Sequence, residues 1–322
     1  MAEVREERKM WEHERLVVRT GRRSGLTTMV AVHSTEAGPA VGGCRMKAYG
    51  HITDAVTDVL RLSKAMTLKC AAAGIPHGGA KSVIVAGREL TPDLRRAVLL
   101  DHAELIDEFG GAYRAGPDVG TGPDDMAVFR ELTPYAYCLP EAQGGTGSSS
   151  GPTARGVLAA LRAASRHTFG TDDLTGRKVV ISGFGSVGEL IAKGIEGADI
   201  TVSDVDESRR TDEYGWVHPD EAYEVEADVL VPAAVGGVLS PETVRRLGVK
   251  LIVGPANNQL TDDGVADLLA ERGIVWVPDH VASAGGVIYT LAREDDGADH
   301  EAALKRVDGI EKTVERLLGV EA

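Results

Sequence analysis

A glycine-rich turn between an apolar run and a helical pattern constrains this chain more than any other feature. The run VVISGFGSVGELIAKGI places Gly183, Gly185 and Gly188 in the spacing GxGxxG. In this spacing the first glycine permits a tight turn, the second lets a pyrophosphate approach the backbone, and the third lets the helix pack closely on the strand. The N-terminus of the following helix offers unpaired N–H groups and a positive dipole end to phosphates. The sequence therefore predicts a dinucleotide-binding turn.

An acidic residue closes the next apolar run, ITVSD. This residue, Asp204, follows Gly183 by 21 positions and would accept hydrogen bonds from the ribose hydroxyls of the adenosine. A carboxylate there repels a 2′-phosphate, so NAD is favoured over NADP. The alternative interpretation is a glycine-rich packing turn with an incidental aspartate. The predicted cofactor contacts around the turn are Gly183, Phe184, Gly185, Ser186, Val187, Gly188, Asp204 and Val205.

Regular alternation of strands and helices surrounds this turn. An amphipathic helix is predicted over residues 155–168, and another over residues 301–318. The apolar runs between them predict a parallel, doubly wound sheet of the Rossmann type. These runs cover residues 178–183, 200–204, 228–233, 250–255 and 274–278.

The first part of the chain has a different pattern, which predicts an α/β domain with a mixed sheet. Residues 26–34 alternate like a strand, residues 53–66 have helical spacing, and residues 81–87 form a short apolar strand. Thr91 and Pro92 supply an N-cap and a first-turn proline for the next helix. That helix would extend to Phe109 and stop at Gly110-Gly111.

The stretch GGTGSSSGP is the only linker-like composition in the chain. We therefore expect a substrate-binding and dimerisation domain over residues 1–145 plus about 295–322, because the last helix is expected to return to it. The NAD-binding domain would cover residues 146–294. Two domains agree with a length of 322 residues at roughly 100–200 residues per domain.

Composition excludes several classes of function. The net charge of −14 disfavours nucleic acids and anionic membrane surfaces as partners. No stretch approaches about 18 uninterrupted apolar residues, so no membrane span is predicted, and the charged N-terminus MAEVREERKMWEHER is not a signal peptide. Three cysteines without a CxxC pair favour a reducing cytoplasm over a disulfide framework. No metal-ligand spacing is found, so no metal is expected.

Two lysines lie in surroundings that are unusual for surface lysines. Lys69 and Lys81 belong to the segment MTLKCAAAGIPHGGAKSVI, which is rich in small residues and poor in other charges. Burial lowers the pKa of a lysine and can make it a base near neutral pH. The alternative for Lys81 is a surface lysine that follows a turn. Two more glycine-rich segments accompany it, GPAVGGCRM over residues 38–46 and AGPDVGTGPDDM over residues 115–126.

Together with GPANNQL (residues 254–260) and SAGGVI (residues 283–288), these segments resemble the glutamate/leucine/phenylalanine/valine dehydrogenase family. The resemblance extends from about residue 30 to about residue 318. GPAVGGCRM and GPANNQL are closest to the leucine, valine and phenylalanine branch, whereas PHGGAK and GPDVGTG are similar to the glutamate branch.

The resemblance implies reversible oxidative deamination of an L-amino acid to a 2-oxo acid and ammonium, with hydride passing to a nicotinamide. Lys69 would pair with the substrate α-carboxylate, and Lys81 would be a lysine of lowered pKa that activates water. Asp118 would hold the amino group and shuttle protons. The reaction would take place in a cleft between the domains, with the linker as one hinge. Further implied contacts are Gly42, Gly43 and Asn258 for the substrate, and Thr153, Ala233, Ala234 and Asn257 for the cofactor.

The family lines its side-chain pocket at positions that here are Val41, Gly116, Val287 and Thr290. In glutamate-specific relatives the first of these is a lysine, so Val41 predicts an apolar substrate, branched-chain or aromatic. The alternatives are a glutamate dehydrogenase and a non-catalytic paralogue that senses NAD or an amino acid. The presence of Lys69, Lys81 and Asp118 weighs against the latter.

The resemblance also bears on assembly. Relatives commonly continue for tens of residues beyond the position of Ala322 and use that segment in subunit contacts. We therefore expect a small homo-oligomer, first of all a dimer formed through the N-terminal domain, and not a large octamer.

Overall fold

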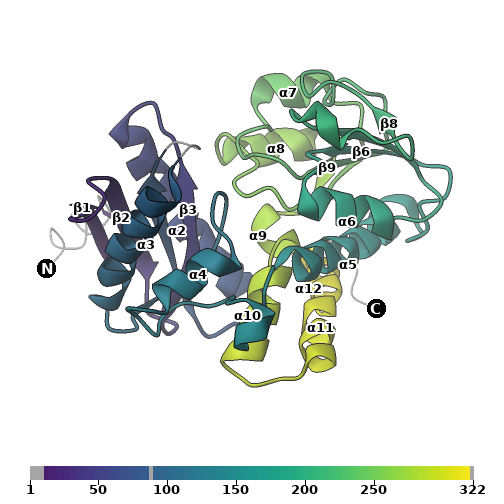
Figure 1. Ribbon diagram of the computed structural model, residues 1–322. Helices are drawn as coiled ribbons and strands as arrows, with labels where there is room; N and C mark the ends of the chain where they lie inside the picture. The colour runs from purple at the N-terminus through teal and green to yellow at the C-terminus, as the bar shows by residue number, and fades with distance from the viewer. Residues whose placement is uncertain (1–10, 87–89, 320–322) are drawn as a thin grey trace, which may run out of the picture. The chain divides into compact units, whose positions relative to one another are not determined.

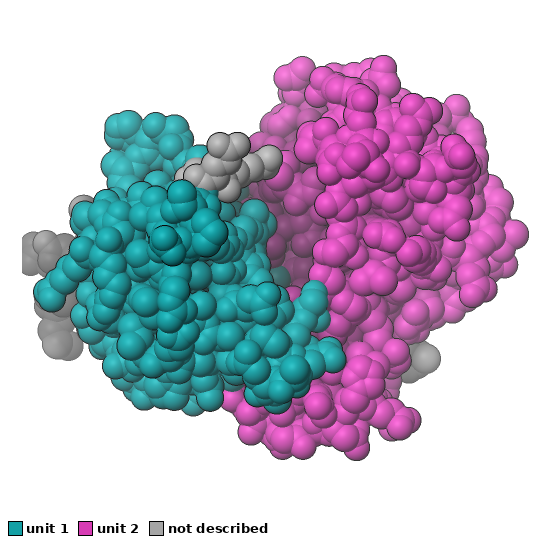
Figure 2. Space-filling model, in the orientation of Figure 1, with its two compact units in different colours: residues 1–148 teal, residues 149–322 magenta. Residues whose placement is uncertain are grey.

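A computed structural model describes residues 11–86 and 90–319 of the chain. The first ten residues of the charged N-terminal segment lie outside the described residues, and so does Gly87, the last residue of the strand expected over residues 81–87. The chain divides into two compact units, residues 1–148 and residues 149–322, which Figure 2 colours separately. Among the described residues no helix is long and apolar enough to cross a membrane.

The first unit contains a mixed sheet, as the sequence predicts, and its five strands have the order β1-β2-β4-β3-β5. Strand β2 runs antiparallel to both β1 and β4, whereas β3 runs parallel to both β4 and β5. Strand β3 therefore lies between two parallel neighbours, which brings three glycine-bearing strands together. The strands are β1 Arg15–Thr20, β2 Thr27–Ser34, β3 Ala40–Lys47, β4 Gly78–Val85 and β5 Tyr113–Pro117.

Helices cover both faces of this sheet. Successive side chains of a strand point to opposite faces, and here both faces carry apolar residues that must be buried. Met29 and Val83 pack toward α2, while Val30 and Ile84 belong to the core shared with α3 and α4. As predicted, Thr91 caps α3 by accepting a hydrogen bond from the Leu94 N–H at 3.3 Å. The helices, visible in Figure 1, are α2 Ile52–Ala72, α3 Pro92–Asp107 and α4 Pro123–Phe129, followed by the 3-10 turn η1 Glu141–Gln143.

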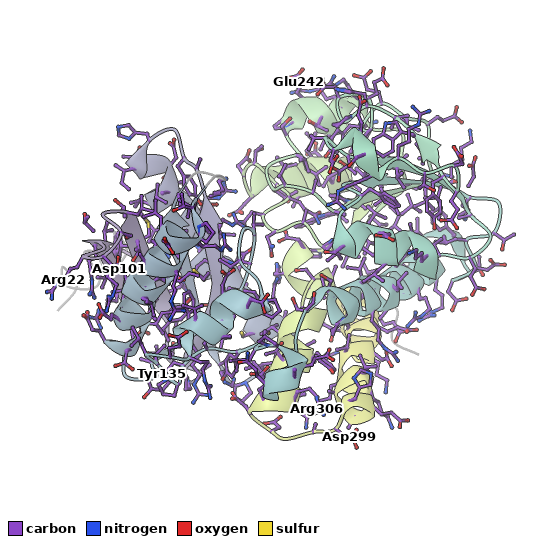
Figure 3. The ribbon with its side chains drawn as sticks, viewed as in Figure 1. Arg22, Asp101, Tyr135, Glu242, Asp299 and Arg306 are labelled. Carbon is purple, nitrogen blue, oxygen red and sulfur yellow. The ribbon has the colours of Figure 1, made fainter. Side chains whose placement is uncertain are left out.

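The turn between β1 and β2 is fastened to α3 by one buried carboxylate, Asp101, which Figure 3 labels together with Arg22 of the turn. Asp101 Oδ2 accepts hydrogen bonds from the Ser24 N–H at 2.9 Å and the Ser24 hydroxyl at 2.7 Å. These bonds hold the pKa of Asp101 below its ordinary value although burial acts to raise it.

The second unit contains a six-stranded, all-parallel sheet in the order β11-β10-β9-β6-β7-β8. This is the strand order of doubly wound dinucleotide-binding folds, and the order reverses between β6 and β9. Five strands were expected from the sequence; the sixth, β8, has only two residues. The strands are β6 Lys178–Ser182, β7 Asp199–Ser203, β8 Gly215–Trp216, β9 Val229–Pro232, β10 Leu251–Ile252 and β11 Val275–Trp276.

The helices of this unit depart from expectation at the C-terminal end. The single helix predicted over residues 301–318 is divided at Gly309 into α11 His300–Asp308 and α12 Ile310–Leu317. The other helical segments are α5 Ser150–Phe169, α6 Ser186–Gly194, the 3-10 turn η2 Glu207–Arg209, α7 Pro241–Arg246, α8 Gly264–Glu271, α9 Asp279–Ala282 and α10 Gly285–Glu294.

Helices α11 and α12 pack on α5, as Figure 1 also shows for the yellow C-terminal segment. Ion pairs join them: Arg155 binds Asp308 at 2.6 Å, and Arg162 binds Glu311 at 2.9 Å. The compact units therefore group the C-terminal helices with the second unit and not with the first, where the sequence analysis expected them.

Candidate functional site

Strand β3 places two glycines in the middle of the first sheet. A Cβ atom at Gly42 would overlap the carbonyl oxygen of Ala80 on β4, so this position requires glycine. On the opposite face, a Cβ at Gly43 would lie 2.7 Å from the Pro117 carbonyl oxygen and 2.8 Å from Asp118 Cβ. The missing side chains therefore let β3 approach both neighbouring strands closely.

The space beside Gly43 is filled by an ion pair between Lys81 of β4 and Asp118, which follows β5. Lys81 Nζ contacts Asp118 Oδ2, and the two side chains are 7% and 11% exposed. The structure thus brings together the two residues that the resemblance implies as catalytic. It also places Lys81 in the interior of a strand, which excludes the surface-lysine alternative.

A second cation, Arg45 of β3, also approaches Asp118. Its Nη2 lies 3.6 Å from Asp118 Oδ2, and its Nη1 donates a 3.0 Å hydrogen bond to Asp58 of α2. Asp58 in turn accepts a 2.6 Å hydrogen bond from the Tyr49 hydroxyl. Sequence reasoning missed Arg45. The signal was its position two residues after Gly43, which puts both on one face of β3.

The charges around Asp118 keep it ionised. Burial acts to raise its pKa, but the positive charges of Lys81 and Arg45 outweigh burial, and the pKa of this carboxyl lies well below its ordinary value. Its other oxygen, Oδ1, accepts a 2.6 Å hydrogen bond from the Val119 N–H. Asp118 is therefore a carboxylate able to hold an ammonium group.

The loop that carries Asp118 is braced from α3 and α4. Arg95 donates to Asp125 through Nε at 2.9 Å and through Nη2 at 2.7 Å, and the same Nη2 donates to the Gly120 carbonyl at 2.8 Å. The Thr121 hydroxyl donates to the Cys44 carbonyl of β3 at 2.7 Å. These bonds fix the backbone of the residues that follow Asp118 in the chain.

A polar chain supports β3 from the other face of the sheet. His102 Nε2 and the Tyr113 hydroxyl lie 2.8 and 2.9 Å from the Ser82 hydroxyl, and the Tyr113 hydroxyl donates to the Gly42 carbonyl at 3.1 Å. Burial lowers the pKa of His102 to about 3, so the imidazole is neutral. His102, Tyr113 and Ser82 are all buried. Ser82 follows Lys81 on β4, so these groups lie on the face of the sheet opposite to the Lys81 side chain.

Three further predicted residues belong to this unit. Lys69 lies in the last turn of α2 and is 8% exposed, and Val41 of β3 is 3% exposed. A Cβ at Gly116 would meet open space. Directly across the sheet from Val41 lies Arg114 of β5, a basic residue that sequence reasoning overlooked. Its Nη1 donates to the Tyr137 hydroxyl at 2.7 Å.

In the second unit the three glycines of the predicted turn meet three different environments. Gly183 has φ +111°, and its Cβ would lie 2.5 Å from the Ala234 nitrogen. A Cβ at Gly188 would overlap the Gly183 carbonyl oxygen. A Cβ at Gly185 would meet open space. A tight turn, a helix–strand contact and an open approach to the backbone are the three features that a pyrophosphate requires, so these residues fit a dinucleotide.

The helix that follows the turn is available to an anion. Helix α6 begins at Ser186, and within the described part of the chain no side chain caps its N-terminus. The Ser186 hydroxyl lies 3.1 Å from the Ser150 hydroxyl of α5, while Phe184 is buried and Val187 half-buried. The first-turn N–H groups of α6 can therefore bind phosphate.

Asp204 lies at the carboxyl end of β7, next to the turn. Its Oδ2 accepts a 2.8 Å hydrogen bond from the Phe184 N–H, and its Oδ1 accepts one from the Asp206 N–H at 2.9 Å. The carboxylate therefore joins β7 to the glycine-rich turn and keeps lone pairs for a ribose. The neighbouring Val205 is 87% exposed.

The remaining predicted contacts of this unit lie after other strands or at helix starts. Ala233 and Ala234 follow β9, against Gly183. Asn258 has φ +53°, and its N–H donates to Asp279 Oδ2 at 2.9 Å. The neighbouring Asn257 packs against Gly236, where an added Cβ would overlap the Asn257 carbonyl oxygen. Thr153 lies in the first turn of α5, and Val287 and Thr290 lie on α10.

The chain is similar to known proteins over nearly its whole length. The family model "Glu/Leu/Phe/Val dehydrogenase, dimerisation domain" matches residues 8–135, and the model "Glutamate/Leucine/Phenylalanine/Valine dehydrogenase" matches residues 200–292. A phenylalanine dehydrogenase of Lysinibacillus sphaericus is 39% identical over 318 residues, which cover 95% of this chain and 83% of that protein. A leucine dehydrogenase of Thermoactinomyces intermedius is 39% identical over 307 residues, covering 93% and 83%.

Solved structures agree with these relatives. The crystal structure of L-tryptophan dehydrogenase from Nostoc punctiforme has a TM-score of 0.74 and 32% sequence identity, covering 98% of this chain and 92% of that one. A hetero-hexameric glutamate dehydrogenase from Thermus thermophilus has a TM-score of 0.78 at 23% identity, with 96% and 89% covered, and this likeness concerns the fold alone.

Proposed function

The chain belongs to the Glu/Leu/Phe/Val dehydrogenase family and is an oxidoreductase, and on that premise we propose that it oxidatively deaminates an apolar L-amino acid, with NAD as hydride acceptor. The products would be the 2-oxo acid and ammonium, and the reaction would be reversible. The observation that carries the proposal is the buried contact between Lys81 and Asp118 beside Gly43.

Oxidative deamination needs a base, a site for the amino group and a site for the carboxylate. In the proposed mechanism Asp118 holds the substrate ammonium and takes a proton from it. Lys81, without its proton, activates the water that attacks the imine carbon, and the carbon–nitrogen bond then breaks to release ammonia. The opposite charges of the two groups keep both in place before substrate binds.

Lys69 supplies the charge for the substrate α-carboxylate in this proposal. Lys69 lies in the last turn of α2 and is 8% exposed, and a substrate carboxylate would be an oppositely charged group for this ammonium. Asn258 would add a hydrogen bond to the same carboxylate. The substrate would approach the backbone at Gly42 and Gly43, next to the Lys81–Asp118 pair.

NAD would be held by the glycine-rich turn, the N-terminus of α6 and Asp204, with Thr153, Ala233, Ala234 and Asn257 at the nicotinamide half. When bound there, NAD would supply the acceptor for the hydride of the substrate α-carbon. The Asp204 carboxylate supports NAD over NADP, because a negative charge beside the ribose repels a 2′-phosphate. The open Cβ position at Gly185 supports close approach of the pyrophosphate.

An apolar substrate side chain is supported by Val41 and Gly116, and by Val287 and Thr290 in the second unit. A carboxylate bound against Val41 without a partner would cost several kcal/mol in effective terms, whereas an apolar group gains about 25 cal/mol per Å² buried. Arg114 lies across from Val41, but one of its nitrogens already donates to the Tyr137 hydroxyl. Glutamate would have to compete with that bond.

We further propose a homodimer formed through the first unit. The description of the matching family model as a dimerisation domain supports this arrangement. Light scattering on the purified protein measures the mass directly. A particle near eight times 34.0 kDa would contradict the dimer.

The proposed activity is tested by following NADH absorbance with saturating NAD and a panel of L-amino acids. We expect turnover with Leu, Val, Ile, Met, Phe or Trp and little with Glu or Asp. A kcat/KM for glutamate equal to or above that of every apolar amino acid would favour the glutamate dehydrogenase alternative. Absence of turnover with all of them, together with binding of NAD, would favour the non-catalytic alternative.

A further inference from the structure

Arg45 is a largely buried cation that has no role in the proposed reaction as described above. Its side chain is 13% exposed and approaches two carboxylates, Asp118 at 3.6 Å and Asp58 at 3.0 Å. Its Nε is buried and has no hydrogen-bond partner in the described part of the chain. Burying a guanidinium with an unsatisfied donor costs free energy, so packing alone does not explain why an arginine is found here.

One thiol and two phenols near Asp118 are neutral. Burial raises the pKa of Cys44 to about 12, and burial raises the pKa of Tyr113 well above its ordinary value. Burial, with Asp58 as a second cause, raises the pKa of Tyr49. Among the described residues, the charged groups around Asp118 are therefore Lys81, Arg45 and Asp58, with the buried Lys69 further along α2 and the Arg95–Asp125 pair on α3 and α4.

The proposed reaction requires one of these charges to disappear. Lys81 must lose its proton to act as a base, and its positive charge then no longer stabilises Asp118. Arginine does not lose its proton in proteins. Arg45 is therefore the cation that still faces Asp118 at that moment.

Building on the proposed function, we propose that Arg45 is a positioning residue, the fixed positive charge that holds Asp118 as a carboxylate while Lys81 is deprotonated. Asp58 opposes this effect, because it lies against the same guanidinium and cancels part of its charge. A fixed cation near the Lys81–Asp118 pair favours loss of the proton that the pair shares. Removing the cation makes that proton harder to lose, and removing Asp58 makes it easier.

The activity experiment measures kcat/KM against pH for the wild type and the variants Arg45→Met, Arg45→Lys and Asp58→Asn. In Arg45→Met we expect the acid limb to move to higher pH by about one unit or more. In Asp58→Asn it should move to lower pH, and by less, since the Asp58 side chain is more exposed to solvent than that of Arg45. Arg45→Lys, which keeps the charge, should lie near the wild type.

Arg96→Gln is the matched control, because it removes an arginine of the same unit that pairs with the exposed Glu131. Its pH profile should superimpose on that of the wild type. A merely structural Arg45 would give a lower unfolding midpoint and an equal loss of activity at every pH. That result, or an Arg45→Met profile unchanged from the wild type, overturns the proposal.

A second measurement does not depend on activity. Lys81→Met imitates the deprotonated lysine, and the titration of Asp118 is followed by NMR in protein labelled with ¹³C-aspartate. With Arg45 present, Asp118 should stay ionised at neutral pH. In Lys81→Met/Arg45→Met it should titrate at least about one pH unit higher. Identical titrations in the two backgrounds overturn the role of Arg45, whereas failure of the proposed function appears separately, as a wild type without turnover.

Discussion

Gly43 is the residue at which backbone packing and chemistry meet. Its absent side chain leaves the space that Lys81 Nζ and Asp118 share, and an added Cβ would lie 3.3 Å from that nitrogen. We predict that Gly43→Ala lowers kcat by at least about 100-fold, because displacing a reacting group by a fraction of an ångström to 1 Å has effects of this size. Steady-state kinetics with the preferred amino acid measures the loss.

Gly116→Ala is the control for this variant. Gly116 pairs with Gly43 across the strands, yet a Cβ there meets open space. It should therefore fold normally, retain kcat, and change KM mainly for the largest side chains. If Gly43→Ala and Gly116→Ala behaved alike, the space beside Gly43 would have no special part in the reaction.

Lys81 itself is tested by Lys81→Ala. Loss of an activating base typically costs 10²–10⁴-fold in rate, and Asp118 keeps Arg45 as a partner, so the fold should survive. We expect turnover to fall by at least about 100-fold while NAD affinity, measured by fluorescence titration, stays the same. Turnover within a few fold of the wild type would remove Lys81 from the mechanism.

Single residues also show where sequence reasoning ends. Gly42, Gly43, Lys81 and Asp118 can be recognised from motifs, because a motif preserves the order of residues along the chain. The roles of Arg45 and Arg114 depend on neighbours that are distant in the sequence. Arg45 lies near Asp118, and Arg114 lies across from Val41. Such neighbours depend on strand order and register, which the linear pattern does not specify.

At the scale of elements, the β6–α6 turn and the end of β7 are joined by Asp204. We predict that Asp204→Ser/Val205→Arg raises the ratio of NADP to NAD efficiency by at least about tenfold, because the repulsion of a 2′-phosphate is replaced by attraction. Kinetics with each cofactor measures the ratio. Asp204→Asn, which retains an acceptor for the Phe184 N–H, separates loss of charge from loss of the turn's support.

The unmodified protein is itself informative about Asp204. Equal use of NADP and NAD by the wild type would show that this carboxylate does not select the cofactor. Its two backbone hydrogen bonds would then be its whole role.

His102, where α3 packs on β4, links stability to pH. Burial lowers the pKa of His102 in the folded protein to about 3 from an ordinary 6.5. On acidification the imidazole is therefore protonated in the unfolded chain before it is protonated in the folded one. Stability is therefore fully present above about pH 6.5 and is lost as pH falls toward the folded pKa. The loss from this residue is about 2 kcal/mol by about pH 5.

The variant His102→Gln cannot titrate and keeps a group able to reach Ser82. Urea unfolding at neutral pH and at about pH 5 should show that the stability advantage of the wild type over this variant shrinks by about 2 kcal/mol on acidification. Other histidines contribute equally to both proteins and cancel in the difference. A constant difference would mean that the imidazole is protonated in the folded protein.

Elements were more predictable where local signals were strong. Thr91 and Pro92 marked the start of α3 because capping chemistry is local. The two-residue strand β8 was missed because it is too short to have a periodicity. The division at Gly309 was missed because apolar positions continue in register through α11 and α12, and one glycine within a helical pattern is often tolerated.

For the whole molecule, the sequence predicted two α/β domains and their sheet types, since strand–helix alternation and binary pattern determine these. It assigned the C-terminal helices to the first domain. The structure instead packs them on α5, through pairs such as Arg155–Asp308 between residues 153 positions apart. Surface charges on two helices carry little information about which helix each will meet.

The division into two units predicts how NAD affects unfolding of the whole chain. Every proposed cofactor contact lies within residues 149–322, and so do Trp216 and Trp276, whereas Trp11 lies in the first unit. A ligand that binds only the folded form stabilises it by about 2.7 kcal/mol at 100 times its Kd. NAD should therefore raise the midpoint of the unfolding transition followed by tryptophan fluorescence.

Two glycine variants of the same turn make this prediction specific. Gly185→Val adds a side chain where the structure has open space, so the protein without NAD should unfold at the wild-type midpoint, while the upward shift caused by NAD should disappear. Gly188→Val places a side chain against the Gly183 carbonyl and should lower the midpoint even without NAD. If Gly185→Val kept the full NAD-induced shift, the pyrophosphate would not approach the backbone at this turn, and the cofactor would have to bind elsewhere in the chain.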